Sequence, residues 1–143
     1  MWQSVIKQPG RKLPFSFAGF DVPILDATTT KLLAEVAGTD AQFPPVSISG
    51  ESSSYNILAA TKTVSCVDES QSEFTRWTEA DGRPDKLGQY RMFTRLALAA
   101  SAVPSEAELF RVAGWKQALV ASEKLVRELQ RTVKEGLVYE RVA

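Results

Sequence analysis

The sequence of 143 residues contains no histidine. Histidine is the commonest general base near neutral pH and the commonest protein ligand for transition metals. Its absence excludes Ser-His-Asp and Cys-His nucleophile sites, histidine-bearing zinc sites and the iron site built from two histidines and one carboxylate. Enzymes that work with Asp, Glu, Lys or Tyr pass this filter. We nevertheless expect a protein without catalytic residues, cofactor or metal.

Cysteine is nearly absent too, since Cys66 is the only one in the chain. One cysteine forms neither an internal disulfide nor a four-cysteine zinc site, and this agrees with a reducing compartment. Cys66 lies in a strand-like run with nothing nearby in sequence to lower the pKa of its thiol. It is therefore expected to be a small buried hydrophobic residue.

Long hydrophobic runs are also missing. No stretch approaches the roughly 18 apolar residues of a membrane-spanning helix. The first residues, MWQSVIKQPGRKLP, lack the continuous apolar region of a signal peptide. We therefore expect a cytoplasmic protein with no membrane partner.

Neither sign of charge is in excess, because 17 basic residues face 17 acidic ones. General binding to nucleic acid needs a basic surplus or stripe, so we expect no direct nucleic-acid partner. What the chain does have is the make-up of a globular protein, with 44% hydrophobic and 24% charged residues. Its length fits one domain and leaves no room for a second.

Two segments carry helix signals, at about residues 26–37 and 123–135. Asp26 and Ser122 stand at their N-cap positions, and a glycine ends each segment. The apolar side chains of each segment fall on one helical face: Leu32, Leu33 and Val36 in the first, and Leu125, Val126, Leu129 and Val133 in the second. These are the two principal helices that we expect.

Short alternations of apolar and polar side chains predict β-strands, which fall at residues 13–17, 22–25, 43–49, 108–114, 117–121 and 137–142. Residues 55–67 and 90–104 are rich in apolar and β-branched side chains and are predicted to be central strands. Strands and helices together indicate a single α+β domain over residues 1–143. Its sheet is expected to be mixed or mainly antiparallel.

The stretch CVDESQSEFTRWTEADGRPD, residues 66–85, lies between those two predicted central strands. It holds six carboxylates, on Asp68, Glu69, Glu73, Glu79, Asp81 and Asp85. A connection of about 22 residues is longer than most loops, and such length often marks function or disorder. The carboxylate spacing does not fit a calcium-binding EF-hand, and carboxylates are usually just solvated. Phe74 and Trp77 suggest a binding surface, although they could equally fix the loop to the core.

The run FPPVSISGESSSYNILAATKTVSCVDESQSEF resembles the central signature of a bacterial immunity-protein family that is found beside polymorphic toxins, immunity family eleven. The matching positions are Pro45 and Val46, Tyr55 to Leu58, and Asp68 with Ser72. The later segment 108–142 is similar to another part of that family. Its matching residues are Phe110, Arg111, Val120, Ser122, Glu123 and, before the last strand, Gly136. The resemblance spans most of residues 13–142, with NILAAT standing where the family tends to have a Leu-Asn-Val core.

This resemblance implies a small α+β protein without catalysis, made by the toxin-bearing cell and its kin. Such a protein binds the toxic domain of a bacterial effector and blocks its active site or another surface that it needs. Residues that match the family motif are expected to be structural, with Asp68 bonded to a backbone N–H and Ser72 acting as a cap. That structural set is Asp68, Ser72, Phe110, Arg111 and Ser122.

The exposed, variable part of the stretch is then the candidate contact surface for the toxin. Its residues are Glu73, Phe74, Trp77, Glu79, Asp81 and Asp85. Carboxylates would steer a basic toxin such as a nuclease, although a NAD-consuming toxin fits almost as well. Two alternatives stay open: a small carboxylate-based hydrolase, and an adaptor or structural module of a secretion system. A monomer and a homodimer are equally compatible with the sequence.

Overall fold

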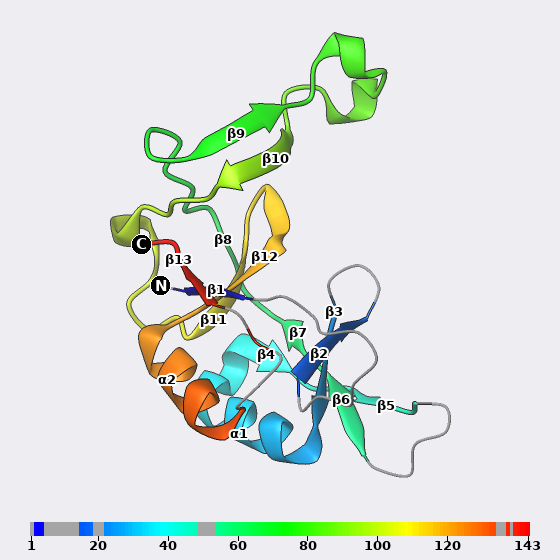
Figure 1. The fold of residues 1–143 in the computed structure, drawn as a ribbon, viewed down its shortest axis with the longest axis vertical. Coiled ribbons are helices and arrows are strands. Elements are labelled where there is room, and N and C mark those ends of the chain that lie inside the picture. Colours follow the sequence, from blue (N-terminus) through cyan, green and yellow to red (C-terminus); the bar gives the residue numbers. More distant parts are fainter. Residues whose placement is uncertain (1, 5–14, 19–21, 49–53, 134–136, 138) are drawn as a thin grey trace.

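The computed structural model describes residues 2–4, 15–18, 22–48, 54–133, 137 and 139–143 (Figure 1). In this part of the chain, two α-helices and a set of mainly antiparallel strands form an α+β fold, which confirms the predicted class. The strands do not form one sheet. They are divided among a five-stranded sheet, a four-stranded sheet and two strand pairs.

The five-stranded sheet has the order β13-β1-β12-β11-β8. Its members are β1 (Trp2–Ser4), β8 (Thr63–Val64), β11 (Leu109–Val112), β12 (Trp115–Ala121) and β13 (Tyr139–Arg141). β8 runs parallel to β11, and the other neighbours in this sheet are antiparallel. β11 and β12 form a hairpin that turns at Gly114, whose φ of +82° favours glycine.

The four-stranded sheet has the order β2-β3-β6-β5. Its members are β2 (Phe15–Ala18), β3 (Val22–Asp26), β5 (Pro45–Val46) and β6 (Tyr55–Ile57). One strand pair joins β4 (Ala41–Gln42) to β7 (Ala59–Ala60), and the other joins β9 (Glu73–Arg76) to β10 (Tyr90–Arg95).

Both predictions of a long central strand are wrong. Residues 55–67 contain three short strands, β6, β7 and β8, and each of them pairs in a different sheet. In residues 90–104, β10 ends at Arg95, and among the described residues it pairs only with β9. A 3-10 helix, η5 (Ala100–Ala102), follows it. The apolar composition of these segments reflects packing on several small surfaces rather than a place in the middle of one sheet.

The two helices begin at the predicted caps. Asp26 accepts a hydrogen bond of 2.8 Å from the backbone N–H of Thr29 at the start of α1 (Ala27–Ala37). Ser122 accepts one of 3.1 Å from Leu125 at the start of α2 (Glu123–Thr132). α2 ends earlier than predicted, because the next residue, Val133, has an extended backbone; the predicted stop at Gly136 lies outside the described residues.

The β11–β12 hairpin separates two hydrophobic cores. Leu109 and Leu119 face a core that they share with the buried faces of α1 and α2. Phe110 and Val120, both fully buried, face a second core that also contains Cys66. Cys66 is buried, as predicted, and burial raises the pKa of its thiol to about 11. Where both faces of the hairpin are covered, at residues 118–121 of β12, the strand is a continuous apolar run, whereas Lys116 and Gln117 before it are exposed.

Asp40 ties three segments together at the edge of the first core. It ends the 3-10 helix η2 (Gly38–Asp40) and is only 3% exposed. Its carboxylate lies 2.8 Å from the Lys62 ammonium and accepts backbone hydrogen bonds of 2.7 Å from Glu108 and 3.3 Å from Leu109. Burial alone would raise the pKa of Asp40, but these partners outweigh burial and hold it below its usual value. Asp40 is therefore a buried but fully partnered charge.

Candidate functional site

Residues 73–85 of the acidic stretch belong to a projection, which we call the arm and define as residues 73–95. The arm consists of β9, the 3-10 helices η3 (Glu79–Asp81) and η4 (Pro84–Lys86), and β10. Figure 1 shows it in green at one end of the molecule, with α1 and α2 at the opposite end. The expected long solvated connection is thus a hairpin with an ordered tip.

Hydrogen bonds fix the base of the arm by joining the segment before it, residues 68–72, to Ala97, which follows it. The carbonyl of Ala97 accepts a hydrogen bond of 2.9 Å from the backbone N–H of Asp68. The Ser72 hydroxyl donates to the same carbonyl and accepts a hydrogen bond from the N–H of Ala97. The Asp68 carboxylate accepts from the N–H of Ser70 at 3.1 Å and from that of Gln71 at 3.3 Å. Asp68 therefore stabilises the turn at residues 68–71. Ser72 does not cap that turn but bonds to Ala97, on the segment that leaves the arm.

The arm contributes no fully buried side chain to the protein. Cys66 and Leu96, at its two ends, are 2% and 5% exposed, but every residue from 67 to 95 is half-buried or exposed. Two large hydrophobic side chains stand out, Leu87 at 52% and Met92 at 57% exposed. The arm is ordered, yet among the described residues its only contribution to the cores is the half-buried Phe93, which packs against the second core.

Aromatic packing holds the inner face of the arm against the body. The ring of Phe74 lies 5.2 Å from that of Tyr90, edge to face, and 5.5 Å from that of Phe93. Phe93 in turn lies 5.4 Å from Trp115 on the β11–β12 hairpin. Phe74 was expected as a contact residue for a partner, but its ring is used within the arm, which is the alternative role that the sequence left open.

The carboxylates of the arm are largely paired with its own arginines. Arg91 lies 3.2 Å from Asp81, Arg83 lies 3.0 Å from Asp85, and Arg95 lies 4.0 Å from Glu73. Glu69, just before the arm, lies 2.5 Å from Arg76, whose guanidinium also stacks 4.7 Å from the centre of the Tyr90 ring. The stretch is therefore not an acidic surface, and the charge-based argument for a basic toxin loses its main support.

Asp81 has a structural role at the tip. Its carboxylate accepts a 2.7 Å hydrogen bond from the backbone N–H of Thr78 and another of 3.1 Å from the Thr78 hydroxyl, which caps η3. These bonds, with Arg91 as a further contributor, lower the pKa of Asp81. Among the six predicted contact residues, this leaves Trp77 and Glu79 as tip residues without a structural ion pair in the described part of the chain.

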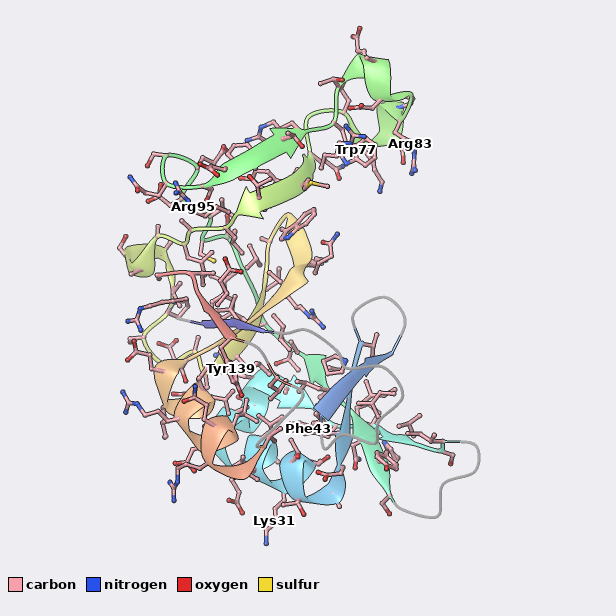
Figure 2. All side chains as sticks on the ribbon, viewed as in Figure 1. Lys31, Phe43, Trp77, Arg83, Arg95 and Tyr139 are labelled. Atoms are coloured by element: carbon pink, nitrogen blue, oxygen red, sulfur yellow. The ribbon has the colours of Figure 1, made fainter. Side chains whose placement is uncertain are left out.

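Trp77 stands between two cations at the tip. Its ring centre is 5.2 Å from the Lys86 ammonium and 5.1 Å from the Arg91 guanidinium carbon. Two backbone hydrogen bonds hold it in place, one to the carbonyl of Gln89 at 2.9 Å and one from the N–H of Gly88 at 3.0 Å. Figure 2 shows Trp77 and Arg83 at the outer end of the arm and Arg95 at the other end of the hairpin.

A cleft of about 200 Å³ lies between the arm and the β11–β12 hairpin. We call it the tip cleft; its lining residues are Trp77, Lys86, Gln89, Tyr90, Arg91, Gly114, Trp115 and Gln117. Of these, only Trp77 was among the predicted site residues. Lys86 directly follows the predicted stretch and Arg91 comes a few residues later. No local pattern links Trp115 and Gln117 to that stretch, because the fold makes the contact.

The remaining predicted structural residues lie in the body. Phe110 is fully buried, and the Arg111 guanidinium donates to the carbonyls of Lys116 and Gln117 at 3.2 and 3.3 Å. Ser122, besides capping α2, donates its hydroxyl to the carboxylate of Glu108. All three therefore make contacts of the kind expected of structural residues.

Three further features could indicate a function: a second pocket, a group of metal-binding side chains and a helix that could span a membrane. A larger pocket of about 470 Å³ lies beside the start of α2, and its lining includes Glu123 and Arg141, which form an ion pair of 2.6 Å. In the described residues, no three His, Cys, Asp or Glu side chains come together in a group that could hold a metal ion. No helix in those residues is long and apolar enough to cross a bilayer.

No protein-family model matches the sequence, and a search of curated proteins finds no match either.

Proposed function

We propose that the chain is an immunity protein, which binds the toxic domain of a cognate antibacterial effector and neutralises it in the cytoplasm of the producing cell. The observation that carries this proposal is the arm. It is ordered by its own ion pairs and aromatic contacts, supplies no fully buried side chain, and displays Leu87 and Met92 to solvent. Exposed apolar groups beside a tryptophan and an arginine are typical of binding surfaces.

Inhibition by the arm needs no reactive group in this chain. A protruding hairpin can enter the active site of a toxin or cover a surface that the toxin uses, and either event blocks activity by exclusion. The paired carboxylates of the arm give no preference for a basic nuclease over another toxin. The hydrolase alternative has less support, since the carboxylates of Glu73, Asp81 and Asp85 are engaged by arginines or backbone groups. No observation favours the adaptor alternative.

Co-expression with the toxin domain of a neighbouring effector gene tests the proposal. We expect the full chain to rescue growth and to form a complex that survives gel filtration. A double variant, Trp77→Ala with Glu79→Lys, should weaken that complex about 10- to 100-fold and reduce the rescue, because a tip anchor is lost. Asp81 is left unchanged, since it caps η3.

The matched control is Glu35→Lys, the same charge reversal at an exposed position of α1, far from the arm. It should bind the toxin as the unmodified chain does, and both variants should keep its melting temperature. Failure of the full chain to rescue growth or to capture the toxin would discard the proposal. Full binding by the arm variant would discard only the use of the tip.

A further inference from the structure

The tip cleft has a one-sided charge. Its lining includes two cations, Lys86 and Arg91, and no carboxylate. The Lys86 ammonium stacks on Trp77, and among the described residues no carboxylate oxygen lies within 4.0 Å of it. An ammonium has three donors, and a guanidinium has five, so Arg91 keeps donors to spare beyond its contact with Asp81. The cleft is therefore prepared to accept an anion.

The rest of the lining narrows the kind of anion. Two carboxamides also line the cleft: that of Gln117, and that of Gln89, whose Nε2 donates to the carbonyl of Asp85 at 3.4 Å and keeps one further N–H. The rings of Trp77 and Trp115 provide flat apolar walls. A carboxylate on a short aliphatic stem suits these groups, because its oxygens can meet the donors while its stem lies against the rings. The chemistry thus fits the side chain of Asp or Glu.

Size and surroundings favour a protein as the source of that carboxylate. A cleft of about 200 Å³ is smaller than the roughly 300–1,000 Å³ of most small-molecule sites. Leu87 and Met92, which directly follow Lys86 and Arg91 in the sequence, would stay exposed to water if the cleft held only a small anion. A protein segment with an apolar residue beside its acidic one would cover both features.

On the basis of the proposed function, we infer that the tip cleft receives an acidic side chain from the toxin domain, with Lys86 and Arg91 as its partners. The direction of the charge contact is the reverse of what the acidic composition of residues 66–85 suggests. The carboxylates of the arm hold its tip together, and Lys86 with the spare donors of Arg91 is left to face the partner.

Two substitutions test this inference on the complex. Lys86→Gln and Arg83→Gln each remove one positive charge from the same turn of the tip, but only Lys86 lines the cleft, whereas Arg83 pairs with Asp85. We expect Lys86→Gln to weaken binding to the toxin domain about tenfold or more at low salt, and Arg83→Gln to change it less than threefold. Equal effects of the two substitutions, or no effect of Lys86→Gln, would overturn the inference.

A second measurement uses the full chain alone. The indole N–H signals of Trp77 and Trp115 are followed by NMR while three probes are added: the peptide acetyl-Glu-Leu-Glu-amide, its Gln-Leu-Gln counterpart, and inorganic phosphate. We expect the acidic peptide to shift both signals, and the shifts to be lost in Lys86→Gln. Shifts from phosphate as large as those from the acidic peptide would replace the inference with a small-anion site. No shift from the acidic peptide would also overturn it.

These results separate the two proposals. A toxin domain that binds regardless of Lys86 would leave the immunity function standing and remove the cleft from the contact. If the acidic peptide binds in the cleft but the chain captures no toxin domain, the cleft keeps its preference for an acidic side chain and the immunity function is discarded.

Discussion

At the scale of single residues, Asp40 shows how a buried charge can stabilise a fold. Its carboxylate forms an ion pair with Lys62 and accepts hydrogen bonds from two backbone N–H groups at the start of β11. A buried carboxylate without such partners would be strongly destabilising, but a fully partnered one holds its neighbours in register. Here it connects the end of α1 to the strand that divides the two cores.

Replacing Asp40 with Asn should therefore lower the free energy of unfolding at pH 7 by about 2–4 kcal/mol, because charge-assisted hydrogen bonds are lost in a buried place. The pKa of Asp40 is lowered in the folded protein, so its stabilisation is complete above its unfolded value near 4 and is lost as the pH falls further. The difference between wild type and variant should accordingly shrink below about pH 4.

Urea unfolding at several pH values measures this effect. Asp85→Asn is the control, since Asp85 is exposed on the arm and pairs only with Arg83 among the described residues. It should leave the unfolding midpoint almost unchanged at pH 7. A constant gap between wild type and Asp40→Asn from pH 7 to pH 3 would contradict the role given to the carboxylate.

At the scale of elements, local signals predict the helices well. An N-cap and an apolar stripe are both properties of neighbouring residues, so α1 and α2 begin where the sequence indicates. The strands of residues 55–67 are different. Their division into β6, β7 and β8 depends on which distant strand each one meets, and no local pattern contains that information.

Residues 73–85 of the arm were predicted to be a connection and not a strand for a related reason. β9 reads EFTR, with Phe74 as its one apolar side chain, so it lacks the alternation of a half-buried strand. It is ordered because Phe74 and Phe93 share a cluster with Trp115, which comes from another part of the sequence. The charge of residues 66–85 also gave a wrong picture of the surface. Two of the arginines that neutralise its carboxylates, Arg91 and Arg95, come after the stretch in the sequence.

Docking of the arm on the body can be tested at Gly114. A Cβ atom at this position would lie 3.1 Å from Cδ2 and 3.2 Å from Cε2 of Tyr90, so an added methyl group would push the arm away. Gly114→Ala should cost about 1–2 kcal/mol for the left-handed backbone and about 1 kcal/mol more for the displaced ring. Limited proteolysis should then cut within the arm sooner than in the wild type.

Gly82→Ala is the matched control. Gly82 has a similar φ of +71°, but nothing lies within 4 Å of its added Cβ atom. It should lose only the backbone contribution and keep the docking of the arm. Equal stability losses and equal cleavage of the two variants would show that Tyr90 and Gly114 do not hold the arm in place.

At the scale of the whole molecule, the first hydrophobic core and the exposed arm lie at opposite ends. The helices and the first core lie at one end, and the arm lies at the other (Figure 1). Both cores draw on the β11–β12 hairpin, while the arm meets the body mainly through Phe93, Tyr90 and Trp115. The arm should therefore be removable without loss of the fold.

Replacing residues 73–95 with Gly-Ser-Gly tests this separation. We expect the shortened chain to unfold cooperatively and to lose only about 1–3 kcal/mol of stability, because the contact of Phe93 with Trp115 disappears. It should no longer bind the toxin domain. Circular dichroism during urea unfolding measures the first outcome and gel filtration the second. A chain without a cooperative transition would show that the arm is part of the folding unit.

The irregular register of the arm also affects how it behaves among its own copies. The pairing of β9 with β10 shifts between Tyr90 and Met92 and again between Phe93 and Arg95, so the pair contains two bulges. A flat two-stranded ribbon with open edges invites other chains to extend it, and bulges and edge charges oppose that. Leu87 and Met92 can therefore stay exposed on the arm while strand addition between copies of the chain is opposed.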